Sequence, residues 1–191
     1  MTSLAFSSLL AKSSRTSATI VFNTTLGPAI EAEEATYSGL IKIINSKIAK
    51  DENYSRYFVS DCHDKGSGLW GRPDIALWGR KVFKYIAEPI IHVITYEVKL
   101  ARNFDVKAVY QTASHRMFSN FSYIIVCCGE QYGALERVDA RTMAAIKEQG
   151  VGLIVVEDID NFDEWTVEVA AEFKNPDPER LNSFIATAFS G

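Results

Sequence analysis

The sequence Pro-Ile-Ile-His-Val-Ile-Thr-Tyr-Glu-Val-Lys-Leu, residues 89–100, decides the fold. Its β-branched and aromatic residues predict a strong β-strand. Further along the chain, apolar residues at positions 106, 109, 110, 113 and 117 predict a helix over Phe104–Phe118. The apolar run Tyr123–Cys128 then predicts a second strand, one that is buried on both faces.

The C-terminal part of the chain continues this alternation. Asp139 is a suitable N-cap for a helix that runs through Glu148 and is closed by Gly150. The apolar run Val151–Val156 predicts another buried strand, and a last helix is expected over Pro178–Phe189. An order of strand, helix, strand, helix, strand favours parallel pairing with both faces of the sheet covered. The chain is therefore expected to be α/β.

Two more strands and a helix are expected on the N-terminal side. Arg56–Asp61 and Pro73–Trp78 are predicted strands, separated by a turn over Asp64–Gly71. Apolar residues at positions 30, 37, 41, 44 and 48 predict a helix that begins at Pro28. Residues 1–27 are expected to be an N-terminal extension or a lead-in strand, and residues 28–191 to form one domain.

The composition limits the class of protein. A chain of 191 residues is long enough for one domain with a proper core and too short for two comfortable ones. No apolar run approaches the roughly 20 residues that a membrane-spanning helix needs, so no membrane association is expected. The odd number of cysteines argues against a disulfide scaffold and favours a reducing compartment, the cytoplasm.

The charge of the chain is unevenly distributed. The formal net charge is -4, which by itself argues against binding to nucleic acid. Residues 72–116, however, contain eight Lys or Arg against four acidic residues. A locally basic middle in an acidic chain can still face a polyanion.

Three side chains with complementary chemistry are expected to meet at strand ends. Asp74 opens the strand Pro73–Trp78, and Glu97 and Lys99 lie near the end of the strand quoted above. Side chains at i and i+2 of a strand point to the same face, so Glu97 and Lys99 share one. Two carboxylates suit Mg²⁺ or Mn²⁺, which can activate a water and neutralise charge on a phosphodiester. A neighbouring lysine can stabilise developing negative charge.

Further polar residues lie on the two flanking helices. Glu33 and Glu34 fall in the gap between the apolar positions 30 and 37, so at least one lies at the edge of the buried stripe. An acid there needs a partner or a metal ion. The helix Phe104–Phe118 carries Gln111 on its polar face, together with Lys107, Ser114 and His115. Lys107 and His115 are candidates for contact with nucleic acid, with a solvated helix face as the alternative.

These residues together resemble the PD-(D/E)XK, or restriction-endonuclease-like, nuclease superfamily. Pro73-Asp74 matches the PD element and Glu97-Val98-Lys99 the (D/E)XK element, and the resemblance extends from about residue 28 to 156. It implies a central mixed sheet flanked by helices and metal-dependent hydrolysis of a phosphodiester bond. It also implies an extra acid on the first long helix, for which Glu34 is favoured over Glu33, and a polar residue near the site, Gln111.

The resemblance predicts a nuclease that uses Mg²⁺ or Mn²⁺ and cleaves DNA more readily than RNA. Two alternatives remain: a binding or structural protein that kept this fold without cleavage, and an RNA-cleaving enzyme on the same site. Cutting both strands with so small a domain calls for a homodimer, and a partner protein could supply specificity. Asp61-Cys62-His63-Asp64 invites a zinc site but lacks a second ligand pair at a known spacing.

Overall fold

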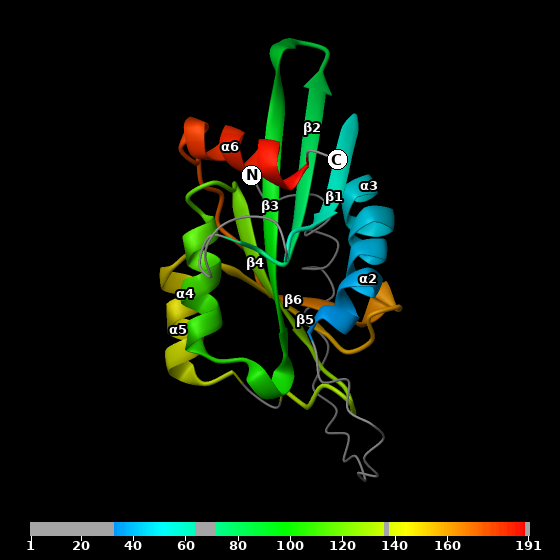
Figure 1. Cartoon of the computed structure of the whole chain (residues 1–191), viewed down its shortest axis with the longest axis vertical. Coiled ribbons are helices and arrows are strands. Elements are labelled where there is room, and N and C mark those ends of the chain that lie inside the picture. The colour runs from blue at the N-terminus through cyan, green and yellow to red at the C-terminus, as the bar shows by residue number, and fades with distance from the viewer. Residues whose placement is uncertain (1–32, 64–71, 136–137, 190–191) are drawn as a thin grey trace.

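The computed structural model describes residues 33–63, 72–135 and 138–189 (Figure 1). The expected extension or lead-in strand over residues 1–27, the start of the first helix at Pro28, and the expected turn over 64–71 lie outside the described residues.

A six-stranded mixed sheet forms the centre of the domain, with strands in the order β1-β2-β3-β4-β5-β6. The first three strands are antiparallel neighbours, β3–β4 and β4–β5 are parallel, and β6 returns antiparallel to β5. The predicted parallel pairing of the buried strands is therefore confirmed. The strands are β1 (Arg56–Asp61), β2 (Ile75–Phe83), β3 (Ile86–Leu100), β4 (Phe121–Cys127), β5 (Gly152–Val156) and β6 (Trp165–Val169).

Helices cover both faces of this sheet (Figure 1). On one face, α2 packs over the sheet's larger apolar cluster and continues through a π-helical turn, η1, into α3. On the other face, α4 and α5 pack over a second cluster around β4 and β5, while α6 packs against β1 and β2. The helical bounds are α2 (Glu34–Ile43), η1 (Ile44–Ile48), α3 (Ala49–Asp51), η2 (Ala101–Asn103), α4 (Val106–His115), α5 (Ala140–Glu148), η3 (Phe162–Glu164) and α6 (Pro178–Ala188).

The predicted single α/β domain with a mixed sheet flanked by helices is confirmed, with three differences in the elements. The strand expected from Pro89 begins at Ile86, because its first residues pair with the end of β2, which continues to Phe83 in a long hairpin. The helix expected over Phe104–Phe118 is shorter at both ends. It begins at Val106, because the Asp105 side chain caps it by accepting a hydrogen bond from the backbone N–H of Lys107, and it ends at His115. The edge strand β6 was not predicted.

One feature of this fold places the candidate residues. The apolar C-terminal half of β3 lies between β2 and β4 in the sheet, and because helices cover both faces of the sheet, its side chains are buried. In the described part of the chain, no helix combines the length and apolar character needed to cross a membrane.

Candidate active site

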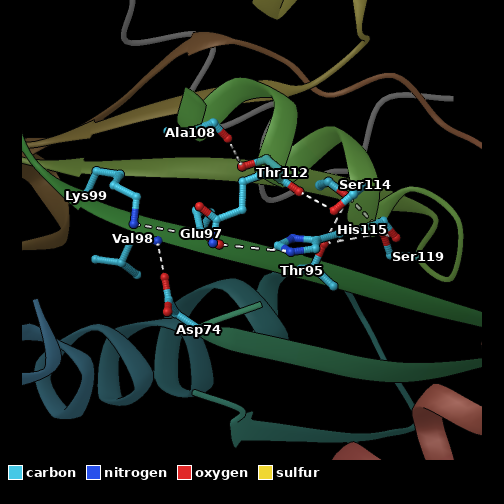
Figure 2. Close-up of polar contacts among 12 residues, drawn as sticks. Asp74, Thr95, Glu97, Val98, Lys99, Ala108, Thr112, Ser114, His115 and Ser119 are labelled. Carbon is cyan, nitrogen blue, oxygen red and sulfur yellow. Dashed lines mark hydrogen bonds and ion pairs between the residues drawn. The ribbon is translucent and has the colours of Figure 1, made fainter. Parts of the chain in front are cut away.

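The pairing of β2 with β3 brings Asp74 beside Glu97. Ile75 lies opposite Tyr96 in the antiparallel register, and the backbone N–H of Asp74 donates to the Tyr96 carbonyl at 3.1 Å. Asp74, just before β2 begins, is thereby placed alongside Glu97. The sequence-predicted trio of Asp74, Glu97 and Lys99 does come together in the structure (Figure 2).

The Asp74 carboxylate is held by two hydrogen bonds. The Tyr37 hydroxyl on α2 donates to Oδ1 at 2.7 Å, and the backbone N–H of Val98 donates to Oδ2 at 2.7 Å. Burial raises the pKa of Asp74 above its ordinary value, although both hydrogen bonds and the Lys99 charge oppose that rise. The orientation of this carboxylate is therefore fixed by α2 on one side and by the β3 backbone on the other.

Glu97 is the most deeply buried acid of the site. Its side chain is 1% exposed, and Lys99 Nζ forms an ion pair with Oε1 at 2.9 Å. Apart from this ion pair, neither carboxylate oxygen accepts a hydrogen bond from any described residue. Burial raises the pKa of Glu97 to about 8, and the nearby Asp74 charge adds to that effect while Lys99 opposes it.

Lys99 joins two acids that are far apart in the sequence. Its Nζ lies 2.9 Å from Glu97 Oε1 and 3.0 Å from Glu33 Oε2, and its side chain is 16% exposed. Burial lowers the pKa of Lys99, but the carboxylates of Glu97 and Glu33 outweigh burial and raise the pKa above its ordinary value. The ammonium group is therefore charged at neutral pH, at the boundary between the buried site and solvent.

Glu33, and not the favoured Glu34, is the acid that reaches the site. Glu34 is exposed on the first turn of α2, where its side chain points to solvent. Glu33 directly precedes the helix, and its backbone carbonyl accepts hydrogen bonds from the Thr36 N–H at 2.9 Å and the Thr36 hydroxyl at 2.6 Å. The expectation for Glu34 was wrong because α2 is oriented with the residue before its first turn toward Lys99.

The helix α4 presents a different residue to the site from the one expected. Gln111 is half-buried, and within the described part of the chain its side-chain amide makes no hydrogen bond to the acidic cluster. His115, one turn further along α4, is fully buried, with Nε2 4.0 Å from Glu97 Oε2. Contact with nucleic acid and a solvated helix face both require an exposed His115, so both readings were wrong for this residue, whereas Lys107 is exposed as expected.

Asp74 and Glu97 have the donor chemistry for a hard divalent cation. Among the described residues, no three His, Cys, Asp or Glu side chains are gathered closely enough to hold a metal ion by themselves. Mg²⁺ does not require such a group, since it keeps several waters and is usually bound through one or two carboxylates. Glu97 Oε2, which accepts no hydrogen bond from any described residue, is a buried acceptor that a cation would satisfy. The residues present therefore fit Mg²⁺ or Mn²⁺.

Comparisons with known proteins give a fold resemblance only. No family model matches this chain, and no curated protein matches it. Its backbone is similar to a solved structure, the SPO1766 protein of unknown function from Silicibacter pomeroyi, with a TM-score of 0.49 and 14% sequence identity over 87% of each chain. Neither result bears on function, which has to follow from the geometry of Asp74, Glu97 and Lys99.

Proposed function

We propose that this protein is a divalent-metal-dependent nuclease that hydrolyses phosphodiester bonds, with DNA as its substrate. The observation that carries the proposal is the buried Glu97 carboxylate, which lies beside a fixed Asp74 and pairs with a charged Lys99 through Oε1, while its Oε2 accepts no hydrogen bond from any described residue. Leaving a buried carboxylate oxygen without a hydrogen-bond donor is costly for stability alone. A retained costly group of this kind is typical of functional sites.

Each residue of the trio has a distinct role in this proposal. Asp74 and Glu97 would hold Mg²⁺ or Mn²⁺, which supplies an activated water and neutralises charge on the phosphodiester. Tyr37 and the Val98 backbone hold the Asp74 carboxylate in one orientation. Lys99, charged at neutral pH, can orient the attacking water and stabilise the negative charge that develops on phosphate. Glu33 draws Lys99 toward the solvent side of the site.

A second candidate function has an observation of its own. Lys99 already forms ion pairs with Glu97 and Glu33, and such a partly buried ion triplet can exist in a catalytically silent binding or structural protein with the same fold. An RNA-cleaving enzyme would use the same three residues as the DNA nuclease. These alternatives differ in measurable ways, because the silent protein cleaves nothing and the RNA-cleaving enzyme spares DNA.

The deciding experiment measures cleavage of plasmid DNA, single-stranded DNA and RNA in Mg²⁺, Mn²⁺ or EDTA. Wild-type protein is compared with Lys99→Ala and with Lys147→Ala, a control in which an exposed lysine on α5 is removed. Loss of one positioned charge from such a site should reduce cleavage by roughly 100-fold or more in Lys99→Ala, and Lys147→Ala should retain cleavage. Equal metal-dependent cleavage by wild type and Lys99→Ala would refute the assignment.

Two further expectations follow from the same proposal. The three cysteines are all buried, and their odd number favours a reducing compartment, the cytoplasm. A single small domain that cuts both strands would act as a homodimer or with a partner protein that supplies specificity. Sedimentation of the protein with and without a DNA duplex tests the assembly.

A further inference from the structure

His115 occupies the last position of α4, on the interior side of Glu97. Its side chain is completely buried, and the Phe118 ring lies 5.8 Å from the imidazole, centroid to centroid. Figure 2 shows Glu97 between Lys99 and His115, with the two carboxylate oxygens directed to opposite neighbours. Lys99 approaches Oε1 from the solvent side, and His115 Nε2 lies 4.0 Å from Oε2 on the buried side.

The imidazole takes no part in the hydrogen bonding around it. Among the described residues, neither Nδ1 nor Nε2 of His115 has a hydrogen-bond partner. The hydroxyl groups nearby bond to one another instead: Thr95 donates to Ser122 Oγ at 2.9 Å, and Ser119 Oγ lies 2.8 Å from Ser122 Oγ. A histidine retained only for packing is normally satisfied by such neighbours. Instead, Nε2 of His115 faces Oε2 of Glu97, and neither atom has a hydrogen-bond partner among the described residues.

The chemistry of the two groups is complementary. Burial lowers the pKa of His115, and the Lys99 charge adds to that effect. A neutral imidazole can donate its N–H to a carboxylate without adding charge to the site. Hydrogen bonds of this kind are often long before substrate and cofactor bind, and they shorten to about 3 Å in the working complex.

We propose that His115 is a positioning residue whose Nε2–H donates a hydrogen bond to Glu97 Oε2 and fixes the carboxylate in its ligating orientation. The inference rests on the proposed metal-dependent nuclease site and adds a residue of α4 to it. Residues that orient metal ligands typically change metal affinity or activity by about 10–100-fold when they are removed.

Three substitutions separate this role from simple packing. In His115→Gln, the side-chain amide nitrogen lies close to the position of Nε2 and keeps the donor. In His115→Asn, the amide lies near the position of Nδ1 and cannot reach Glu97. His115→Leu removes the donor and keeps an apolar volume. Thr112→Val is the control, because Thr112 is equally buried on α4 and its hydroxyl donates within the helix to the Ala108 carbonyl.

The experiment titrates each full-length protein with Mn²⁺, followed by calorimetry, and measures the Mn²⁺ dependence of cleavage alongside thermal unfolding. We expect Mn²⁺ to bind about 10–100-fold more weakly to His115→Leu and His115→Asn, and within about threefold of wild type to His115→Gln and Thr112→Val. The apparent KM for Mn²⁺ should rise more than kcat falls, because a misoriented ligand is corrected by excess metal.

Two results would overturn the inference. Unchanged Mn²⁺ affinity in the folded His115→Leu protein would show that the imidazole does not orient Glu97. Equal losses in His115→Gln and His115→Leu, in proportion to their loss of thermal stability, would show a packing role. Failure of wild-type protein to bind Mn²⁺ would overturn the proposed metal site itself and the inference with it, so the two failures are distinguishable.

Discussion

Replacing Glu97 by Gln should stabilise the folded protein while it destroys the proposed activity. Burial raises the pKa of Glu97 from its ordinary 4.5 to about 8. Between pH 4.5 and pH 8 the folded chain binds a proton more tightly than the unfolded chain, so stability falls as pH rises. By linkage, ionisation of this carboxyl in the unfolded chain lowers the stability of the fold by about 1 kcal/mol at pH 5 and about 3 kcal/mol at pH 7. The neutral side chain of Glu97→Gln does not ionise in either state, so this loss is absent.

The measurement is urea unfolding of wild-type and Glu97→Gln protein at pH 5, 6 and 7, followed by the fluorescence of tryptophan. Trp165 is completely buried and reports on global unfolding. The advantage of Glu97→Gln over wild type should increase by about 2 kcal/mol between pH 5 and pH 7. This increment is more informative than the absolute difference, because any constant effect of the amide on packing cancels from it.

A matched substitution identifies effects that are unrelated to burial. Glu168→Gln makes the same substitution at an exposed position of β6 and measures the effect of replacing a carboxyl by an amide at the protein surface. The reasoning is refuted if the Glu97→Gln increment is below about 0.5 kcal/mol, the usual error of such differences. It is also refuted if the increment has the opposite sign, because Glu97 would then be stabilised as a carboxylate in the folded protein.

Two further predictions concern single contacts. Glu33→Ala should reduce metal-dependent cleavage by roughly tenfold, because Lys99 loses one of its two carboxylate partners. Glu34→Ala, at the exposed neighbour, is the control and should leave cleavage unchanged. Equal rates for both variants in the same plasmid assay would contradict this prediction. Gly152→Ala should lower the free energy of unfolding in urea by about 1–3 kcal/mol, because a Cβ at position 152 would overlap the buried Tyr123 ring. An unchanged midpoint of the urea unfolding transition would show that the ring can move away.

Local sequence patterns were sufficient for most of the fold. The apolar runs in β3, β4 and β5 contain too many β-branched residues for solvent-facing strands, and their alternation with helices favours parallel pairing. The edge strand β6 was missed, although Trp165 and Val167 alternate with polar residues and are both fully buried. That signal is only five residues long, and short apolar patterns are ambiguous without their sheet neighbours.

The central trio was predictable because strand periodicity fixes which side chains share a face. Glu97 and Lys99 are two residues apart on β3, so any strand pairing leaves them together. Predicting the position of Asp74 required the additional assumption that β2 and β3 are neighbours. The structure meets this assumption, because Ile75 of β2 pairs with Tyr96 of β3. Whether Asp74 and Glu97 bind a metal ion stays a prediction, since Lys99 also forms ion pairs with Glu97 and Glu33.

The residues on helices were harder to place, because a helical pattern gives the relative phase of side chains and not the element that each face meets. Glu33 and Glu34 differ by one position, and only the tilt of α2 decides which of them reaches Lys99. His115 lies in a polar stripe of α4 that the sequence suggested was solvated, yet the His115 side chain itself is buried beside β3. Thr112 and Ser119, at i−3 and i+4 from His115, are fully buried with it. A run of small hydroxyl residues around a histidine is compatible with either environment, because these side chains can bond to backbone carbonyls as well as to water. Only the covering sheet makes the histidine a buried neighbour of Glu97.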